Sequence, residues 1–164
     1  MHPIHDVDVL LLMSTALATK RRPAELVEIM AAMHLLHGSI PLDVDVAASF
    51  LRLSTECLLA EEAGRYTLTP EGVALMGGVR NTRKAETAER LLAIRQELAG
   101  YRPKAEGQPI PLATEAVGAA ILAHRNFLKA PGRNMLVPKP KAATDKPRPP
   151  GQWRRLDGGN RAKR

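Results

Sequence analysis

The segment FLRLSTECLLAEEAGRYTLTPEG, residues 50 to 72, carries the signals that decide the fold. CLLAEE, residues 57 to 62, indicates a short strand, an Ala-Gly pair supplies a turn, and RYTLT alternates as a returning strand. Thr69 is a typical N-cap, and Pro70 suits the first position of a helix, where its missing N–H is not needed. The segment therefore predicts a two-stranded β-hairpin over residues 57–69 that leads directly into a helix.

Three helices are predicted before this hairpin, over residues 6–19, 23–37 and 43–57. In each of them, apolar residues recur at helical spacing and define one buried stripe. The stripes are Val9, Leu12, Met13, Ala16 and Leu17 in the first helix, Leu26, Ile29, Met30, Met33 and Leu36 in the second, and Val46, Phe50, Leu53 and Cys57 in the third. Pro23 suits the first turn of the second helix, and Gly38 is predicted to end it.

Two further helices are predicted downstream, over residues 82–99 and 112–129. Their apolar stripes are Ala88, Leu91, Ile94 and Leu98 in the first, and Ala113, Val117, Ala120, Ile121, His124 and Leu128 in the second. The predicted fold class is therefore mainly α with a small two-stranded β-hairpin. We expect an N-terminal domain over 1–79, a helical extension over 80–130 that serves packing or dimerisation, and a tail over 131–164.

The net charge of +7 is distributed unevenly along the chain. Residues 1–100 carry 10 basic and 13 acidic side chains, whereas residues 101–164 carry 14 basic and 4 acidic ones. The last 34 residues hold 10 basic and 2 acidic side chains, together with six prolines and four glycines. A segment of this composition has too little apolar surface to bury, so we predict a disordered basic tail.

The chain resembles the winged helix-turn-helix superfamily in two respects: the order of three helices followed by a hairpin, and the sequence of residues 50–72. Bacterial members carry similar text: a leucine-rich helix, a Leu-Leu-acidic strand, a glycine turn, an aromatic residue, then Leu-Thr-Pro-Glu-Gly. The resemblance covers about residues 6–76 and implies a winged helix-turn-helix domain. It also implies a DNA-binding protein, such as a transcriptional regulator, because many members of the superfamily bind DNA.

In that superfamily the third helix usually enters the major groove of DNA, and the hairpin, or wing, touches the backbone or the minor groove. The resemblance therefore implies a set of nucleic-acid-binding residues in this chain. Ser49, Arg52 and Thr55 on the third helix would face bases, Arg65 would lie at the tip of the wing, and Lys20, Arg21 and Arg22 would meet phosphate. We predict that Ala48, Ser49, Arg52, Thr55 and Glu56 lie mostly outward.

The charge of the N-terminal part favours a second hypothesis. Residues 1–79 carry 5 basic and 10 acidic side chains, and such a surface repels phosphate. The alternative to DNA binding is a winged helix that serves as a protein-interaction module, with its basic tail touching an acidic partner or RNA. A homodimer through the helices after the hairpin is a further expectation.

The sequence contains no pattern that predicts an enzyme or a cofactor. There is no glycine-rich phosphate loop and no GxSxG motif. Cys57, on the stripe of the third helix, is interpreted as a core thiol. His2 and His5 are three residues apart, as are His34 and His37, but no cysteine or carboxylate cluster accompanies either pair, so we predict no metal site.

The apolar run VLLLMSTALA, residues 9 to 18, is interpreted as a core helix. Asp6 and Asp8 precede it and the basic residues follow it, which is the reverse of the order in a signal peptide. The run is also too short to cross a bilayer. The single cysteine fits a reducing compartment. We therefore expect a cytoplasmic protein without a membrane partner.

Overall fold

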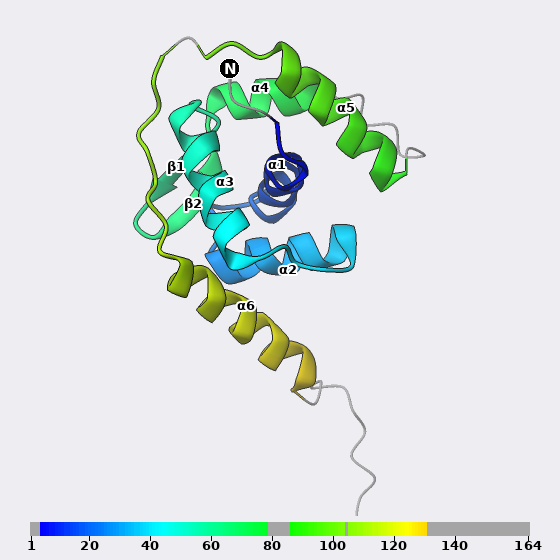
Figure 1. Cartoon of the computed structure of the whole chain (residues 1–164), viewed down its shortest axis with the longest axis vertical. Helices are drawn as coiled ribbons and strands as arrows, with labels where there is room; N and C mark the ends of the chain where they lie inside the picture. The colour runs from blue at the N-terminus through cyan, green and yellow to red at the C-terminus, as the bar shows by residue number, and fades with distance from the viewer. Residues whose placement is uncertain (1–3, 79–85, 104, 131–164) are drawn as a thin grey trace, which may run out of the picture. The chain divides into compact units, whose positions relative to one another are not determined.

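The computed structural model describes residues 4–78, 86–103 and 105–130. Within them lie six helices and a two-stranded antiparallel sheet (Figure 1). The elements are α1 (Asp6–Ala18), α2 (Leu26–His37), α3 (Asp43–Thr55), β1 (Leu59–Glu62), β2 (Arg65–Leu68), α4 (Pro70–Gly78), α5 (Thr87–Gly100) and α6 (Thr114–Lys129). The predicted fold class, mainly α with a small hairpin, is confirmed. The predicted disordered tail, residues 131–164, lies outside the described residues.

Helix α1 lies at the centre of the core. It is therefore buried on more sides than the single stripe predicted for it. Every residue from Asp8 to Thr15 is buried. The cause is its surroundings, because α2, α3, α4, α5 and β2 all contact α1, which Figure 1 shows end-on in dark blue between its neighbours. A helix that is apolar on all sides is expected to lie inside the protein. The hydroxyls of Ser14 and Thr15 fit there because they donate to the carbonyls of Leu10 and Leu11 in the preceding turn.

The hairpin forms as the sequence predicted, with a two-residue turn at Ala63 and Gly64. Both turn residues have positive φ, 52° and 74°, which is the backbone geometry that matches the twist of a tight hairpin. Leu59 pairs with Leu68 at the open end of the hairpin. The strand begins at Leu59 rather than at residue 57, because α3 ends at Thr55 and the chain reverses through Cys57, whose φ is 63°.

Tyr66 connects the hairpin to the rest of the core. Its ring is buried against that of Phe50 of α3, with 5.0 Å between the ring centroids. Its backbone exchanges two hydrogen bonds with Ala24, of 2.8 and 2.9 Å, in an isolated antiparallel bridge. Because residue 24 is extended to make this bridge, α2 begins at Leu26. The prediction that Pro23 lies in the first turn of α2 is therefore wrong.

Thr69 caps α4 as predicted. Its hydroxyl accepts the backbone N–H of Gly72 at 3.1 Å and donates to the carbonyl of Cys57. Pro70 is the first residue of the helix. The predicted stop of α2 at Gly38 is also confirmed, with φ 77° at that residue. These local signals fix the start of α4 and the end of α2.

The two C-terminal helices pack on the N-terminal ones. Helix α5 contacts α1 and α4 and buries Ile94 and Leu98, whereas α6 contacts α2 and α3 and buries Val117, Ala120, Ile121 and His124. Leu128, predicted on the same stripe, is 56% exposed because it lies in the last turn of the helix, beyond those buried residues. Helix α5 begins at Thr87 in the described part of the chain, and the predicted start at residue 82 lies outside it.

Candidate functional site

The residues predicted to meet nucleic acid lie on α3, at the hairpin turn and before α2, and their surroundings decide what they can do. Arg52 is the only basic residue of α3. Its guanidinium donates to the carboxylate of Asp8, with distances of 2.6 Å from Nη2 and 3.2 Å from Nε to Oδ1. The Asp8 side chain is 5% exposed and that of Arg52 25% exposed. Arg52 therefore neutralises a buried carboxylate of α1.

Ser49 does not face outward, so its predicted orientation is wrong. It is fully buried, and its hydroxyl has no hydrogen-bond partner among the described residues. Helix α3 packs against both α1 and α6, so its buried sector is wider than the stripe through Val46, Phe50 and Leu53. The sector includes Ser49 and also Ser54. Ser49 is thus out of reach of a ligand.

Thr55 is exposed as predicted, and its hydroxyl donates to the carbonyl of Leu51 at 2.7 Å. The Cys57 thiol was expected on the buried face of α3. The residue instead follows the helix and is half-buried, because the backbone leaves the helical conformation there. The end of α3 thus carries a hydroxyl and a thiol and no free cation.

The basic residues before α2 and at the hairpin turn lie close together, because the bridge between Ala24 and Tyr66 joins their segments. Arg65 forms an ion pair with Glu25, with 3.2 Å between Nη2 and Oε1. Arg22 forms one with Glu28, with 2.5 Å between the same atom types. Lys20 and Arg21 are exposed and have no hydrogen bond or ion pair to any described residue. Of the predicted cations, these two have no ion pair within the described part of the chain; Arg22 and Arg65 are in exposed pairs, which are weak, so a phosphate could also reach them.

The outward face of α3 is apolar. Val44 is 60% exposed and Leu51 43% exposed, and Ala48 lies between them at helical spacing. Leu42, immediately before the helix, is 71% exposed. We call Leu42, Val44, Ala48 and Leu51 the α3 apolar surface. The predictions above did not include it, although the signal was present: Val44 and Leu51 are seven residues apart and outside the buried stripe.

A long segment from the C-terminal part closes the end of α3. The Gly107 N–H donates to the carbonyl of Thr55 at 2.9 Å, and the Tyr101 hydroxyl donates to that of Glu56 at 3.0 Å. The Ile110 N–H donates to the Ser54 hydroxyl at 2.9 Å. The last carbonyls of a helix have no partners within it, so these bonds complete α3. They also hold the segment that leads into α6 against α3.

Helix α6 is fixed to α2 by a pair of histidines. His34 Nδ1 and His124 Nε2 are 3.0 Å apart, and the two rings meet edge to face. His124 is buried, and that burial, with a smaller contribution from His34, lowers its pKa below the usual 6.5. In this hydrogen bond one of the two facing nitrogens donates its N–H and the other nitrogen accepts. The bond therefore connects the helices when at least one ring is neutral.

Comparison of the chain with protein-family models, with curated proteins and with solved structures gives no match. Among the described residues, no three histidine, cysteine or acidic side chains are grouped so as to hold a metal ion. No helix in that part of the chain is both long enough and apolar enough to cross a bilayer. The functional proposal therefore depends on the geometry and chemistry of α3 and its neighbours.

Proposed function

We propose that this protein is a winged-helix interaction module that binds a protein partner through the α3 apolar surface. The observation that carries the proposal is the engagement of Arg52, the single cation of α3, by the buried carboxylate of Asp8. A helix that reads DNA presents polar and cationic side chains to base edges and phosphates. Helix α3 instead presents Val44 and Leu51 outward, with the half-buried Ala48 between them.

The winged-helix assignment is supported by the order of elements and by one backbone contact. Helices α2 and α3 would form the helix-turn-helix, and β1 and β2 the wing. The bridge between Ala24 and Tyr66 supplies a short extended segment between α1 and α2 that pairs with the wing. In this arrangement the outward face of α3 is open to a partner, while α1 and α6 cover its other sides.

The chemistry of the surface defines the partner. Large exposed apolar side chains that cluster on one helix mark interaction surfaces more often than scattered ones do. Asp45, which is exposed, lies on the same helix, and Asp43 is half-exposed. A partner segment with an apolar face and flanking lysine or arginine side chains would complement both features. An anionic DNA phosphate is not needed to explain any of these residues.

The test uses the full chain and a matched pair of variants. Leu51→Asp places a charge at the C-terminal end of the α3 apolar surface, and Val73→Asp places one on α4, at a residue that is 57% exposed. Proteins retained from cells would be identified with each variant, and the affinity of the purified partner measured. Leu51→Asp should weaken binding at least about tenfold, as loss of a well-packed apolar contact does. Equal binding by both variants would contradict the proposal.

The charge of the tail favours a second candidate function, nucleic-acid binding without sequence preference. Residues 131–164 carry a net charge of +8, and Lys20 and Arg21 add two cations that have no partners among the described residues. Binding of this kind comes from counterion release and is strongly salt-dependent. Titration of the full chain and of residues 1–130 with random duplex DNA and with RNA at two salt concentrations tests it. Unchanged affinity after truncation would exclude the tail as the source.

A further inference from the structure

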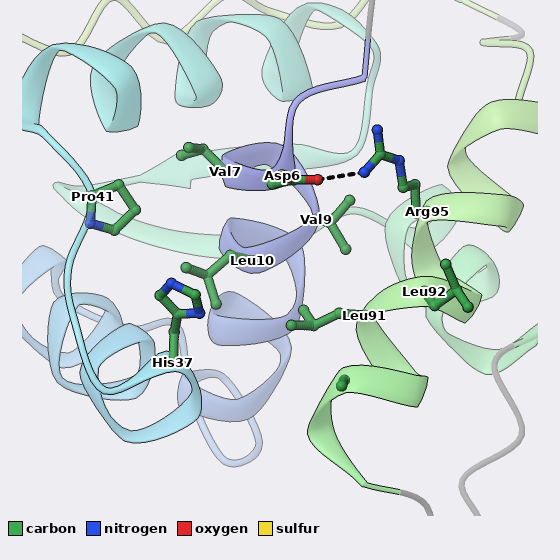
Figure 2. Close-up of a pocket in the computed structure, with 10 residues that line it drawn as sticks. Asp6, Val7, Val9, Leu10, His37, Pro41, Leu91, Leu92 and Arg95 are labelled. Carbon is green, nitrogen blue, oxygen red and sulfur yellow. Dashed lines mark hydrogen bonds and ion pairs between the residues drawn. The ribbon is translucent and has the colours of Figure 1, made fainter.

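A pocket of about 350 Å³ lies between α1, α5 and the connection from α2 to α3. It is separate from the α3 apolar surface, because none of the residues of that surface lines it. Its volume falls within the range of small-molecule sites, roughly 300–1,000 Å³. Figure 2 shows Val9 and Leu10 of α1 facing Leu91 of α5, with Pro41 and His37 on the far side. The pocket therefore has walls from three separate parts of the fold.

The walls of the pocket are mostly apolar, and its polar groups lie at its edges. Val9 and Leu10 are core residues, 3% and 4% exposed, so the wall that they form is rigid. Leu92 of α5 is 59% exposed beside the pocket. The polar lining groups are Asp6, Arg95 and His37, and Figure 2 shows the Asp6–Arg95 pair on one side and His37 on another. This division of apolar body and polar edge suits an amphipathic ligand.

The ion pair at the edge can exchange its anion. Arg95 Nη1 and Asp6 Oδ1 are 2.5 Å apart, but the Asp6 side chain is 87% exposed and that of Arg95 is 51% exposed. An exposed pair of this kind contributes little to stability, because water solvates both charges. A guanidinium has five N–H donors in a planar fork, and Asp6 takes one of them. A ligand carboxylate would bind the remaining donors without a large loss elsewhere.

We propose that this pocket binds a small amphipathic carboxylic acid, with its hydrocarbon body against Val9, Leu10 and Leu91 and its carboxylate on Arg95. The cation determines the sign of the head group. Asp6 is more exposed than Arg95, and it lies in the first turn of α1, where the helix dipole stabilises a carboxylate that faces solvent.

The test compares three probes with the same eight-carbon chain: octanoate, octanol and octylammonium. Each is titrated into the full chain, and the backbone amide shifts of Leu10 and Leu91 are followed by NMR. Octanoate should bind more tightly than octanol, and octanol more tightly than octylammonium. Arg95→Gln should weaken octanoate about tenfold, as loss of a charge-assisted contact does, and leave octanol unchanged. Asp6→Asn should strengthen octanoate by about two- to fivefold, because it removes the competing carboxylate.

Two further variants complete the test. Ala88→Leu fills the pocket from an exposed position of α5 and should abolish the shifts from all three probes. Arg102→Gln removes an exposed cation outside the pocket and should leave octanoate binding unchanged. Equal affinity for the three head groups, an Arg95→Gln variant that binds octanoate normally, or the absence of saturable shifts at Leu10 and Leu91 would each overturn the proposal.

Discussion

The guanidinium of Arg52 on α3 is held by the carboxylate of Asp8 on α1, with 2.6 Å between Nη2 and Oδ1. Asp8 also accepts the backbone N–H of His5 at 3.0 Å, so one carboxylate completes the start of α1 and anchors α3. Since Asp8 is buried, its charge needs the partner that Arg52 supplies. The residue that the winged-helix resemblance implies as a base reader is thus part of the contact between two helices.

Replacing Arg52 by alanine is expected to destabilise the fold strongly. The change leaves the Asp8 carboxylate buried without its cation, and breaking a buried pair in this way costs roughly 3–5 kcal/mol, a figure lowered here by the partial exposure of Arg52. Urea denaturation measures the loss. The double variant Asp8→Asn with Arg52→Leu should regain part of the stability, because it removes both charges. If Arg52→Ala were as stable as the wild type, Arg52 would be free to serve another purpose.

Two serines of α3 should respond in opposite ways to replacement by alanine. Ser49→Ala removes a buried hydroxyl that has no partner among the described residues, so its stability should be unchanged or higher by about 1 kcal/mol. Ser54→Ala removes the acceptor of the Ile110 N–H and should cost about 1–3 kcal/mol. Thermal unfolding of both variants checks the comparison. A loss on Ser49→Ala as large as that on Ser54→Ala would contradict the assigned burial.

Local signals in the sequence predicted the hairpin and the helix ends well. The turn at Ala63 and Gly64, the cap at Thr69 and the stop at Gly38 depend on residues close in the chain. Ala24 was not predicted to be extended, because its backbone partner, Tyr66, is 42 residues away. Short-range patterns contain no information about such a bridge.

The orientation of side chains on α3 was predicted only in part for the same reason. One stripe, through Val46, Phe50 and Leu53, identified one buried side of the helix. It could not reveal that the buried sector of α3 extends to Ser49, or that Arg52 reaches the buried Asp8 44 residues earlier. Once the covered sides of α3 are known, the exposed Leu51 can be recognised as part of an accessible apolar surface.

The stability of the protein should fall as the pH falls below about 6.5, the usual pKa of histidine. Burial lowers the pKa of His124, so the unfolded chain binds more protons than the folded chain in this range. The contribution of neutral, buried His124 to the stability is therefore complete above pH 6.5. It is lost progressively as the pH falls toward the lower pKa that His124 has in the folded chain. Denaturation curves between pH 5 and 8 give the slope. His124→Gln should flatten it, whereas His5→Gln, at an exposed residue, should not.

Gly107 should not tolerate a side chain. A Cβ atom there would overlap the carbonyl oxygen of Ser54 and lie 2.8 Å from the backbone nitrogen of Cys57. Gly107→Ala should therefore separate this segment from α3 and expose α6 to faster amide hydrogen exchange. Gly77→Ala, on α4, meets no atom within 4 Å and should be neutral or stabilising by up to about 1 kcal/mol. Identical exchange in the two variants would refute the close approach.

Photo-crosslinking in cells from a benzophenone side chain at Val44 reports directly what contacts the α3 apolar surface. We predict an adduct with a protein, sensitive to protease and resistant to nuclease, that disappears when Leu51→Asp is added. The same probe at Val73, an exposed residue of α4, serves as the control and should not give this adduct. A nuclease-sensitive adduct from Val44 that survives Leu51→Asp would contradict the account, because α3 would then face nucleic acid.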